Sequence, residues 1–296
     1  MHTYVTQHMT HIKTILAFAF ALLTAVRVQA EVPPGYYDAA DGLNKESLKA
    51  ALHIIIANAT TLNYGSGASS TWSGFYQTDR LPDGRVVDRY SRERHYFAAS
   101  DNAHKAYAPS GLNIEHSIAK SWWGGGRNQA FYDLHHLMPS EEKINAAKSN
   151  FPIGVVTHDT SGNGYTKVGT GKGPNGETIQ MWEPADEWKG DFARVYFYMA
   201  TCYSHLNWQG AQAQRQMDSD WQTLQKWTYE LLLQWSRQDP VSAEEEARNE
   251  AVYRIQGNRN PFIDHPELCE YIWGKHTAEA WSATSKTAKK GKEKTR

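Results

Sequence analysis

The sequence predicts a mostly helical α+β domain with short antiparallel strands. Apolar residues recur at helical spacing in four segments, residues 43–59, 192–203, 221–235 and 243–255. A β-branched and aromatic run at 86–90 follows the turn at 82–84 and is expected to form a strand. The Gly-rich segment 161–178 is typical of a loop or a hairpin. This mixture of helical and strand patterns favours the α+β class.

The segment Pro139–Lys148 is predicted to be a further helix, with Asn145 in its middle. Proline fits the first turn of a helix, and Glu141 and Glu142 suit the positive end of the helix dipole. Pro152 prevents the helix from continuing. Because asparagine is a poor residue for a helix interior, we expect a specific interaction to hold Asn145 there.

The composition indicates a globular protein with a sizeable core. Of the 296 residues, 40% are hydrophobic and 21% are charged. The chain also has 11 tryptophans and 16 tyrosines, which we expect to fill the core or, alternatively, to line a binding groove. We assign residues 31–276 to one domain, which we expect to be monomeric.

The N-terminal residues 1–30 are predicted to be a secretory signal peptide. Lys13 precedes an apolar run at 14–26, and Val28–Ala30 supplies small residues for cleavage. The run is shorter than the ~20 residues of a transmembrane helix. We expect the mature chain to be exported to the periplasm or the medium, without membrane attachment. A retained N-terminal anchor is the alternative.

The charge of the mature chain gives no general attraction to nucleic acid. Removing Lys13 and Arg27, with no acidic residue, takes the formal charge from −1 to −3. Any binding of a polyanion must therefore come from local basic clusters. Residues 277–296 form a basic tail that we expect to be solvated and disordered, with phosphate contact as the alternative.

The two cysteines, Cys202 and Cys269, have two possible states. In an exported protein they can form a disulfide, which would contribute ~4 kcal/mol in the chain-entropy model. The alternative is a pair of separately buried thiols.

Glu115, His116 and Asn145 are the candidate reactive residues. A neutral histidine can take a proton from water near pH 7, and carboxylate and amide oxygens suit a hard cation such as Mg²⁺. Neighbouring residues on a strand point to opposite faces. Glu115 and His116 therefore reach one site only if the strand is bulged, if it ends there, or if the metal lies at its edge.

Several ordered motifs surround these residues. The central motifs are Asn113–Ser117, Lys120–Gly124, Asp133–Leu137 and Ile144–Gly154. Supporting segments lie at 33–37, 190–194, 238–241 and 257–266. Together they resemble the endonuclease I family of secreted, nonspecific bacterial nucleases, over roughly residues 33–274. The resemblance implies a ββα-metal (His-Me finger) core.

The resemblance also implies roles for the candidate residues. His116 matches the general base, polarised through its other ring nitrogen by a backbone or amide oxygen. Glu115 and Asn145 match the ligands of Mg²⁺, with Mn²⁺ or Ca²⁺ as other cations, and the products would carry 5′-phosphates. In such sites an arginine commonly grips the phosphate. The candidates, in order of sequence proximity, are Arg127, Arg194 and Arg259.

Four further residues near the motifs have less defined roles. The family often has arginine where this chain has Lys148, which keeps the charge for phosphate binding but loses the bidentate fork. His135 and His136 either orient a ligand or contact phosphate, or else they are buried and hydrogen-bonded. Asp133 is expected to fix a neighbouring arginine, lysine or backbone group.

The sequence therefore predicts a metal-dependent, nonspecific endonuclease that hydrolyses DNA, with RNA as a second candidate substrate. Two alternatives remain open at this point. One is a secreted, aromatic-rich glycan-binding module. The other is a metal phosphodiesterase that acts on small esters.

Overall fold

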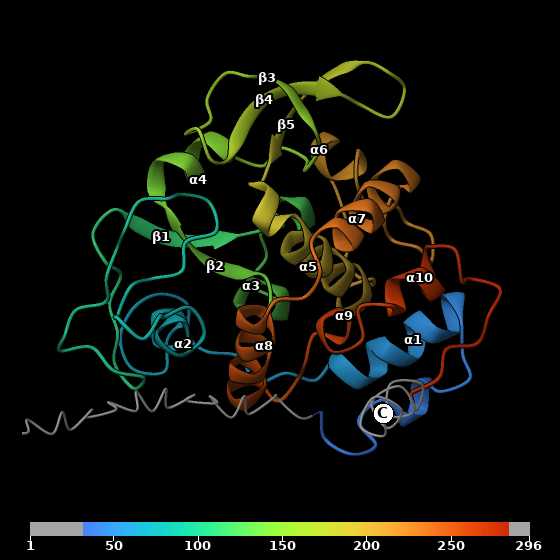
Figure 1. The fold of residues 1–296 in the computed structure, drawn as a ribbon, viewed down its shortest axis with the longest axis horizontal. Helices are drawn as coiled ribbons and strands as arrows, with labels where there is room; N and C mark the ends of the chain where they lie inside the picture. The colour runs from blue at the N-terminus through green and yellow to red at the C-terminus, as the bar shows by residue number, and fades with distance from the viewer. Residues whose placement is uncertain (1–31, 284–296) are drawn as a thin grey trace, which may run out of the picture.

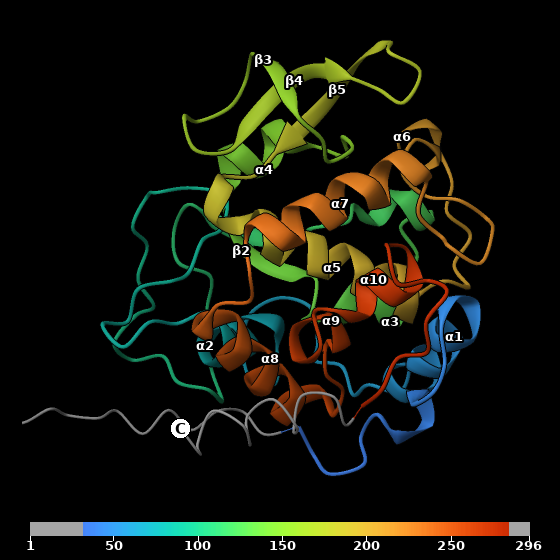
Figure 2. The same ribbon diagram turned by 45° about the vertical axis from the view of Figure 1, so that its right-hand side comes forward.

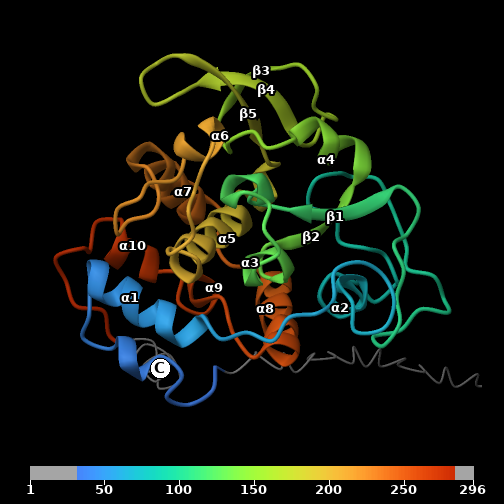
Figure 3. The same cartoon turned by 180° about the vertical axis from the view of Figure 1, so that it is seen from behind.

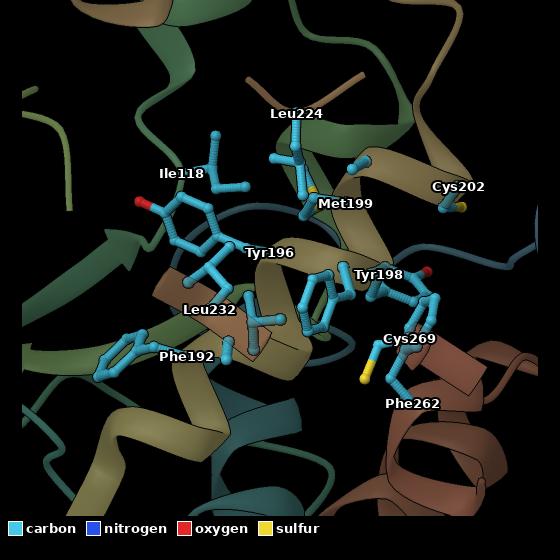
Figure 4. Packing of buried hydrophobic residues seen from close by; sticks show 14 of the residues in the cluster. Ile118, Phe192, Tyr196, Tyr198, Met199, Cys202, Leu224, Leu232, Phe262 and Cys269 are labelled. Carbon is cyan, nitrogen blue, oxygen red and sulfur yellow. The ribbon is translucent and has the colours of Figure 1, made fainter. Parts of the chain in front are cut away.

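Helix α5 (Lys189–Cys202) lies at the centre of the molecule in the computed structural model, which describes residues 32–283 (Figure 1). Every residue from Gly190 to Cys202 is buried, because a helix that is apolar and aromatic on all sides must be covered on all sides. Helices α1, α7 and α9 pack against it. Figure 4 shows side chains of α5, among them Phe192, Tyr196 and Met199, packed with Leu224, Leu232 and Phe262.

Helices α2 and α8 lie side by side, away from α6 (Figure 2). Helix α2 packs on α8, over a cluster that includes Trp72, Phe75 and Leu137. The other α-helices are α1 (Lys45–Ile56), α2 (Thr71–Thr78), α3 (Gln129–Tyr132), α4 (Glu142–Lys148), α6 (Ala211–Gln214), α7 (Lys226–Gln238), α8 (Ala243–Gln256), α9 (Pro261–Asp264) and α10 (Leu268–Ile272). Short 3-10 helices are η1 (Asp38–Ala40), η2 (Lys120–Trp123) and η3 (Asp186–Trp188).

Two small antiparallel sheets complete the architecture, which is a single α+β domain as predicted. Strands β1 (Leu112–His116) and β2 (Leu137–Glu141) form a two-stranded ribbon in which His116 lies opposite Leu137. A second sheet has the order β3-β4-β5, with bounds Val156–Asp159, Lys167–Lys172 and Thr178–Glu183. Figure 3 shows this sheet at one end of the molecule, beyond α4 and α7.

Helix α4 follows β2 without a connecting loop. The Glu141 carboxylate caps the helix by accepting from the backbone N–H groups of Lys143 at 3.0 Å and Ile144 at 2.9 Å. The helix stops at Lys148, because Ser149 adopts a left-handed φ of 50°. Asn145 is therefore in the middle of a helix, as predicted.

The predicted start of this helix at Pro139 is wrong. Pro139 lies in β2, opposite Ile114, and the helix begins at Glu142. Proline is tolerated in this strand because β2 is an edge strand with a partner on one side only. The local pattern of Pro139 and two glutamates fits a helix start equally well, so only the pairing with β1 distinguishes the two.

The predicted strand at 86–90 is also wrong. Val86 makes an isolated bridge to Arg80, and its N–H donates to the His95 carbonyl, but no ladder forms. Asp88 instead accepts from the backbone N–H groups of Tyr90 and Glu141, both at 2.8 Å. The segment therefore holds the end of β2 and does not extend a sheet.

The other predicted elements are confirmed with shifted ends. The helices predicted at 43–59, 192–203 and 243–255 correspond to α1, α5 and α8, and the 161–178 segment contains part of the β4-β5 hairpin. The helix predicted at 221–235 begins only at Lys226, because residue Thr223, with φ 64°, belongs to a turn.

A buried ion pair connects α8 to the end of α2, and the same arginine is hydrogen-bonded to β2. Arg248 of α8 donates to Asp79 at 2.9 Å and to the carbonyls of Leu134 at 2.8 Å and Leu137 at 2.9 Å. Asp79 is fully buried and also accepts from Arg89 at 2.6 Å. Neighbouring cations lower the pKa of Asp79 against the effect of its burial, so the ionised form is maintained. The segment that leads into β2 is thus held by Arg248, which is itself held by Asp79 from a distant part of the chain.

Both cysteines are free, buried thiols, which is the alternative to a disulfide that the sequence left open. Cys202 ends α5 and Cys269 lies in α10 (Figure 4). Burial raises the pKa of each thiol, which leaves both in the unreactive protonated form.

The predicted signal peptide, residues 1–30, and the end of the basic tail, residues 284–296, lie outside the described residues. Within residues 32–283, no helix combines the length and apolar character that crossing a bilayer requires.

We expect Gly169→Ala to lower the free energy of unfolding by about 1–3 kcal/mol, as overpacking of a tight site does. A Cβ atom at this position of β4 would lie 2.0 Å from the His158 carbonyl oxygen of the paired strand. Urea denaturation measures the change. Gly126→Ala is the matched control, because its Cβ would meet no atom within 4 Å. Equal stabilities for the two variants would contradict the packing argument.

Candidate active site

The end of β1 opens into a pocket of about 370 Å³. Glu115 and His116 both line it, although they are neighbours in the chain. They do so because the strand ends at His116 and the backbone turns into η2, which is one of the arrangements that the sequence required. The lining residues are Tyr64, Ile114, Glu115, His116, Ala119, Lys120, Ser121, Asn145, Ser149 and Asn150.

Asn145 reaches the pocket from α4, and a residue of β1 holds its amide. Its Nδ2 donates to Asn113 Oδ1 at 2.5 Å, and its side chain also lowers the pKa of Glu115 slightly against the effect of burial. This is the specific interaction expected for an asparagine inside a helix. Asn113 was missed as a site residue, although it lies two positions before Glu115 and hence on the same face of the strand.

Glu115 forms a buried ion pair with Lys148, the last residue of α4. Lys148 Nζ lies 2.5 Å from Glu115 Oε1, and the two side chains are 1% and 9% exposed. The ammonium group also lies over the Trp182 ring, 4.9 Å from its centroid. Burial raises the pKa of Glu115, and the Lys148 charge opposes that rise. The charge of Lys148 is therefore paired with Glu115 inside the protein, and Lys148 does not line the pocket.

His116 is held as a neutral imidazole by a ring of aromatic side chains. Its Nε2 lies 3.1 Å from the Phe131 carbonyl oxygen, which can only accept, so Nε2 carries the proton and Nδ1 is the basic nitrogen. Tyr64 stacks on the imidazole at a centroid distance of 5.7 Å. Burial and the neighbouring His136 lower the pKa of His116 to about 2.

The residues of the Asp133–Leu137 motif lie behind the pocket and do not line it. Asp133 accepts from the hydroxyls of Tyr198 and Tyr203, both at 2.6 Å, and from the backbone N–H of His135 at 2.8 Å. No arginine or lysine is hydrogen-bonded to it among residues 32–283, so only the backbone part of that expectation is met.

Both neighbouring histidines are buried in the core and are hydrogen-bonded through Nε2, whereas the buried His136 Nδ1 has no hydrogen-bond partner among residues 32–283. His135 Nε2 contacts the Asn258 carbonyl at 3.2 Å, and His136 Nε2 contacts the Ala130 carbonyl at 2.6 Å. Burial lowers the pKa of both imidazoles. Their geometry corresponds to the buried, hydrogen-bonded alternative.

Of the three candidate arginines, only Arg127 lies exposed near the pocket. Its guanidinium is over the Phe131 ring, 5.4 Å from the centroid. Arg194 is fully buried and donates twice to Glu245, at 2.6 Å each. Arg259 is also buried and pairs with Glu250 and Asp264. Sequence proximity ranked Arg127 first, and the structure places the other two in the scaffold.

The pocket also contains residues that the sequence did not single out for function. Tyr64 comes from a loop far from the motifs, and no local signal marks it. Lys120 lies four residues after His116 and was noted only as part of the motif Lys120–Gly124. Its spacing from His116 is the signal that would have found it.

The oxygen donors at the pocket fit a hard divalent cation. Among residues 32–283, no group of three or more His, Cys, Asp or Glu side chains could hold a metal. Magnesium does not need such a group, because it is commonly bound through one or two protein oxygens, with water and phosphate as the other ligands. The Glu115 carboxylate and the Asn145 amide, which line the same pocket, provide that number.

The chain is similar to one family of known proteins and to nucleases from several bacteria. The sequence model of a family described as Endonuclease I matches residues 44–267. An extracellular ribonuclease from Bacillus subtilis is 35% identical over 242 residues, which cover 80% of this chain and 78% of the relative. An extracellular deoxyribonuclease from Aeromonas hydrophila is 27% identical over 152 residues, covering 48% of this chain and 58% of the relative.

We expect Lys148→Met to lower the free energy of unfolding by about 3 kcal/mol, because it leaves the Glu115 carboxylate buried without its partner. Urea denaturation measures the loss. The double variant Glu115→Gln/Lys148→Met should recover most of it, since neither group is then charged. Simple addition of the two single effects would show that the pair is not coupled.

Proposed function

The chain belongs to the endonuclease I family and is an endonuclease, and from this premise we propose that it is a metal-dependent, sequence-nonspecific enzyme acting on DNA and RNA. It hydrolyses phosphodiester bonds and leaves 5′-phosphates. The observation that carries the proposal is the convergence of Glu115, His116 and Asn145 on one pocket. The order strand, strand, helix of β1, β2 and α4 supports a ββα-metal (His-Me finger) core.

His116 acts as the general base. The hydrogen bond from Nε2 to the Phe131 carbonyl oxygen fixes the tautomer and leaves Nδ1 to accept a proton from the attacking water. Burial keeps the imidazole unprotonated, as a general base must be before it takes a proton, and the same burial lowers the basicity of the ring. The stacked Tyr64 ring and the tilted Phe131 ring restrict rotation of the imidazole.

Glu115 and Asn145 hold the cation, for which Mg²⁺ is the proposed identity. When bound, it supplies a positive charge to the phosphate and the leaving oxygen. Lys148 and Asn113 position these two ligands, by an ion pair and an amide hydrogen bond respectively. Arg127, exposed beside Phe131, grips the phosphate.

The absence of a base-reading element in this proposal explains the nonspecific cleavage. Every group assigned here acts on the phosphate or on water, and such contacts carry no sequence information. One relative is named a ribonuclease and another a deoxyribonuclease, which supports activity on both nucleic acids. The word extracellular in the names of both relatives supports export of this chain, in agreement with the expected signal at 1–30.

The aromatic content does not favour a glycan-binding module. None of the 11 tryptophans, all of which lie within residues 32–283, is exposed. Seven of them are in the buried core, namely Trp72, Trp122, Trp123, Trp182, Trp235, Trp273 and Trp281. These rings are core side chains, as the first reading of the composition expected.

We expect His116→Ala to reduce cleavage of plasmid DNA and of RNA by about 10²- to 10⁴-fold, the usual contribution of a general base. The control is His158→Ala, which removes an exposed histidine on β3. Circular dichroism should show the same fold for both variants. Cleavage by His116→Ala at the rate of the control would remove its assigned role.

We expect Asn145→Ala to raise the Mg²⁺ concentration needed for half-maximal cleavage, and EDTA to abolish cleavage by the wild type. One of two protein oxygens for the cation is lost, so its affinity should fall. Asn175→Ala, in the exposed β4-β5 turn, is the control. Isothermal titration with Mg²⁺ gives the affinity independently of turnover. An unchanged metal titration would exclude Asn145 as a ligand.

A further inference from the structure

Lys120 places a positive charge at the rim of the pocket. It begins η2 and lines the pocket, and its side chain is exposed. Its Nζ lies over the Phe131 ring, 5.5 Å from the centroid. The Arg127 guanidinium lies over the same ring at 5.4 Å. The two charges are therefore no farther apart than the sum of these two distances.

This pair of cations has no acidic partner. Neither Lys120 nor Arg127 makes an ion pair within residues 32–283, whereas Lys148, Arg194, Arg248 and Arg259 all do. The one carboxylate that lines the pocket, that of Glu115, is already paired with Lys148. The rim is thus locally positive on a chain whose formal charge is −1. Exposed cations with no carboxylate beside them remain available to a polyanion.

Phe131 links this charge to the reaction centre. Its ring lies 4.9 Å from the His116 ring and 4.7 Å from the Tyr64 ring. Glu115 and His116 are only 7% and 5% exposed, so the phosphate that is cleaved has to approach the inner part of the pocket. Lys120 lines the same pocket, but its side chain is exposed, whereas those of Glu115 and His116 are buried.

We propose that Lys120 binds the backbone phosphate next to the scissile one, and so makes a strand with more than one phosphate the preferred substrate. The proposal rests on the proposed nuclease function. A lysine suits this task because its compact charge binds phosphate without demanding one orientation. Such a contact adds affinity equally for every base sequence.

The test compares two substrates that differ in the number of phosphates. Bis(p-nitrophenyl) phosphate has only the scissile group, whereas an oligonucleotide has neighbours. We expect Lys120→Gln to raise KM for the oligonucleotide roughly tenfold with little change in kcat, as loss of one charge-assisted hydrogen bond does. Its kcat/KM for the small ester should be unchanged. Lys120→Arg should restore the oligonucleotide KM.

Binding without turnover gives a second readout. On a His116→Ala background, the oligonucleotide Kd is measured against salt concentration, with and without Lys120→Gln. The slope of log Kd against log salt should fall by about 0.7 to 0.9, the value for one phosphate contact. Lys226→Gln is the matched control, because Lys226 is an exposed lysine on α7 outside the pocket lining.

The outcomes separate this inference from the function on which it rests. If the wild type cleaves both substrates and Lys120→Gln behaves like Lys226→Gln, the inference is overturned and the proposed function is not. An equal loss on both substrates would also overturn it, because Lys120 would then contact the scissile phosphate. A wild-type protein that cleaves neither substrate with Mg²⁺ would overturn the proposed function and this inference together.

Discussion

The antiparallel pairing of β1 with β2 is the constraint on which the candidate site depends. Because His116 lies opposite Leu137, β1 stops where β2 starts, and its last two side chains reach one pocket. Glu141 then ends β2 and caps α4 in the same step. The helix that carries Asn145 and Lys148 therefore has no loop in which to vary its position. A slip of one residue in the register would turn Glu115 away from both.

Charge is distributed differently in the scaffold and at the pocket. Among residues 32–283, the buried Lys148 and the buried arginines Arg89, Arg194, Arg248 and Arg259 each pair with an acidic side chain, since an unpaired charge there is too costly. Arg248 illustrates this, because it is held by Asp79 and in turn holds the carbonyls that lead into β2. The exposed cations Lys120 and Arg127 lie over the Phe131 ring and have no ion-pair partner among residues 32–283. The paired charges build the site, and the unpaired ones remain available to a substrate.

The sequence predicted the content of the site better than its surroundings. Glu115, His116 and Asn145 were identified because their chemistry and spacing are local properties of the chain. The start of α4 was misplaced because a proline followed by glutamates is compatible with a helix, and only pairing with β1 makes Pro139 a strand residue. Arg194 and Arg259 were reasonable phosphate ligands by residue type. Glu245, the partner of Arg194, lies far along the sequence in α8. Asp264, the partner of Arg259, lies in α9.

The sequence by itself determined the α+β class, the nuclease family motifs and the residues able to supply a base and two oxygen ligands. These follow from periodicity and from the order of short motifs, which depend on neighbours in the chain. Only the tertiary structure decided that Lys148 neutralises Glu115, that Asn113 holds Asn145, and that Tyr64 and Phe131 enclose His116. The reason is physical: burial and partnership are set by groups that folding brings together from separate segments, and a linear pattern does not contain those distances.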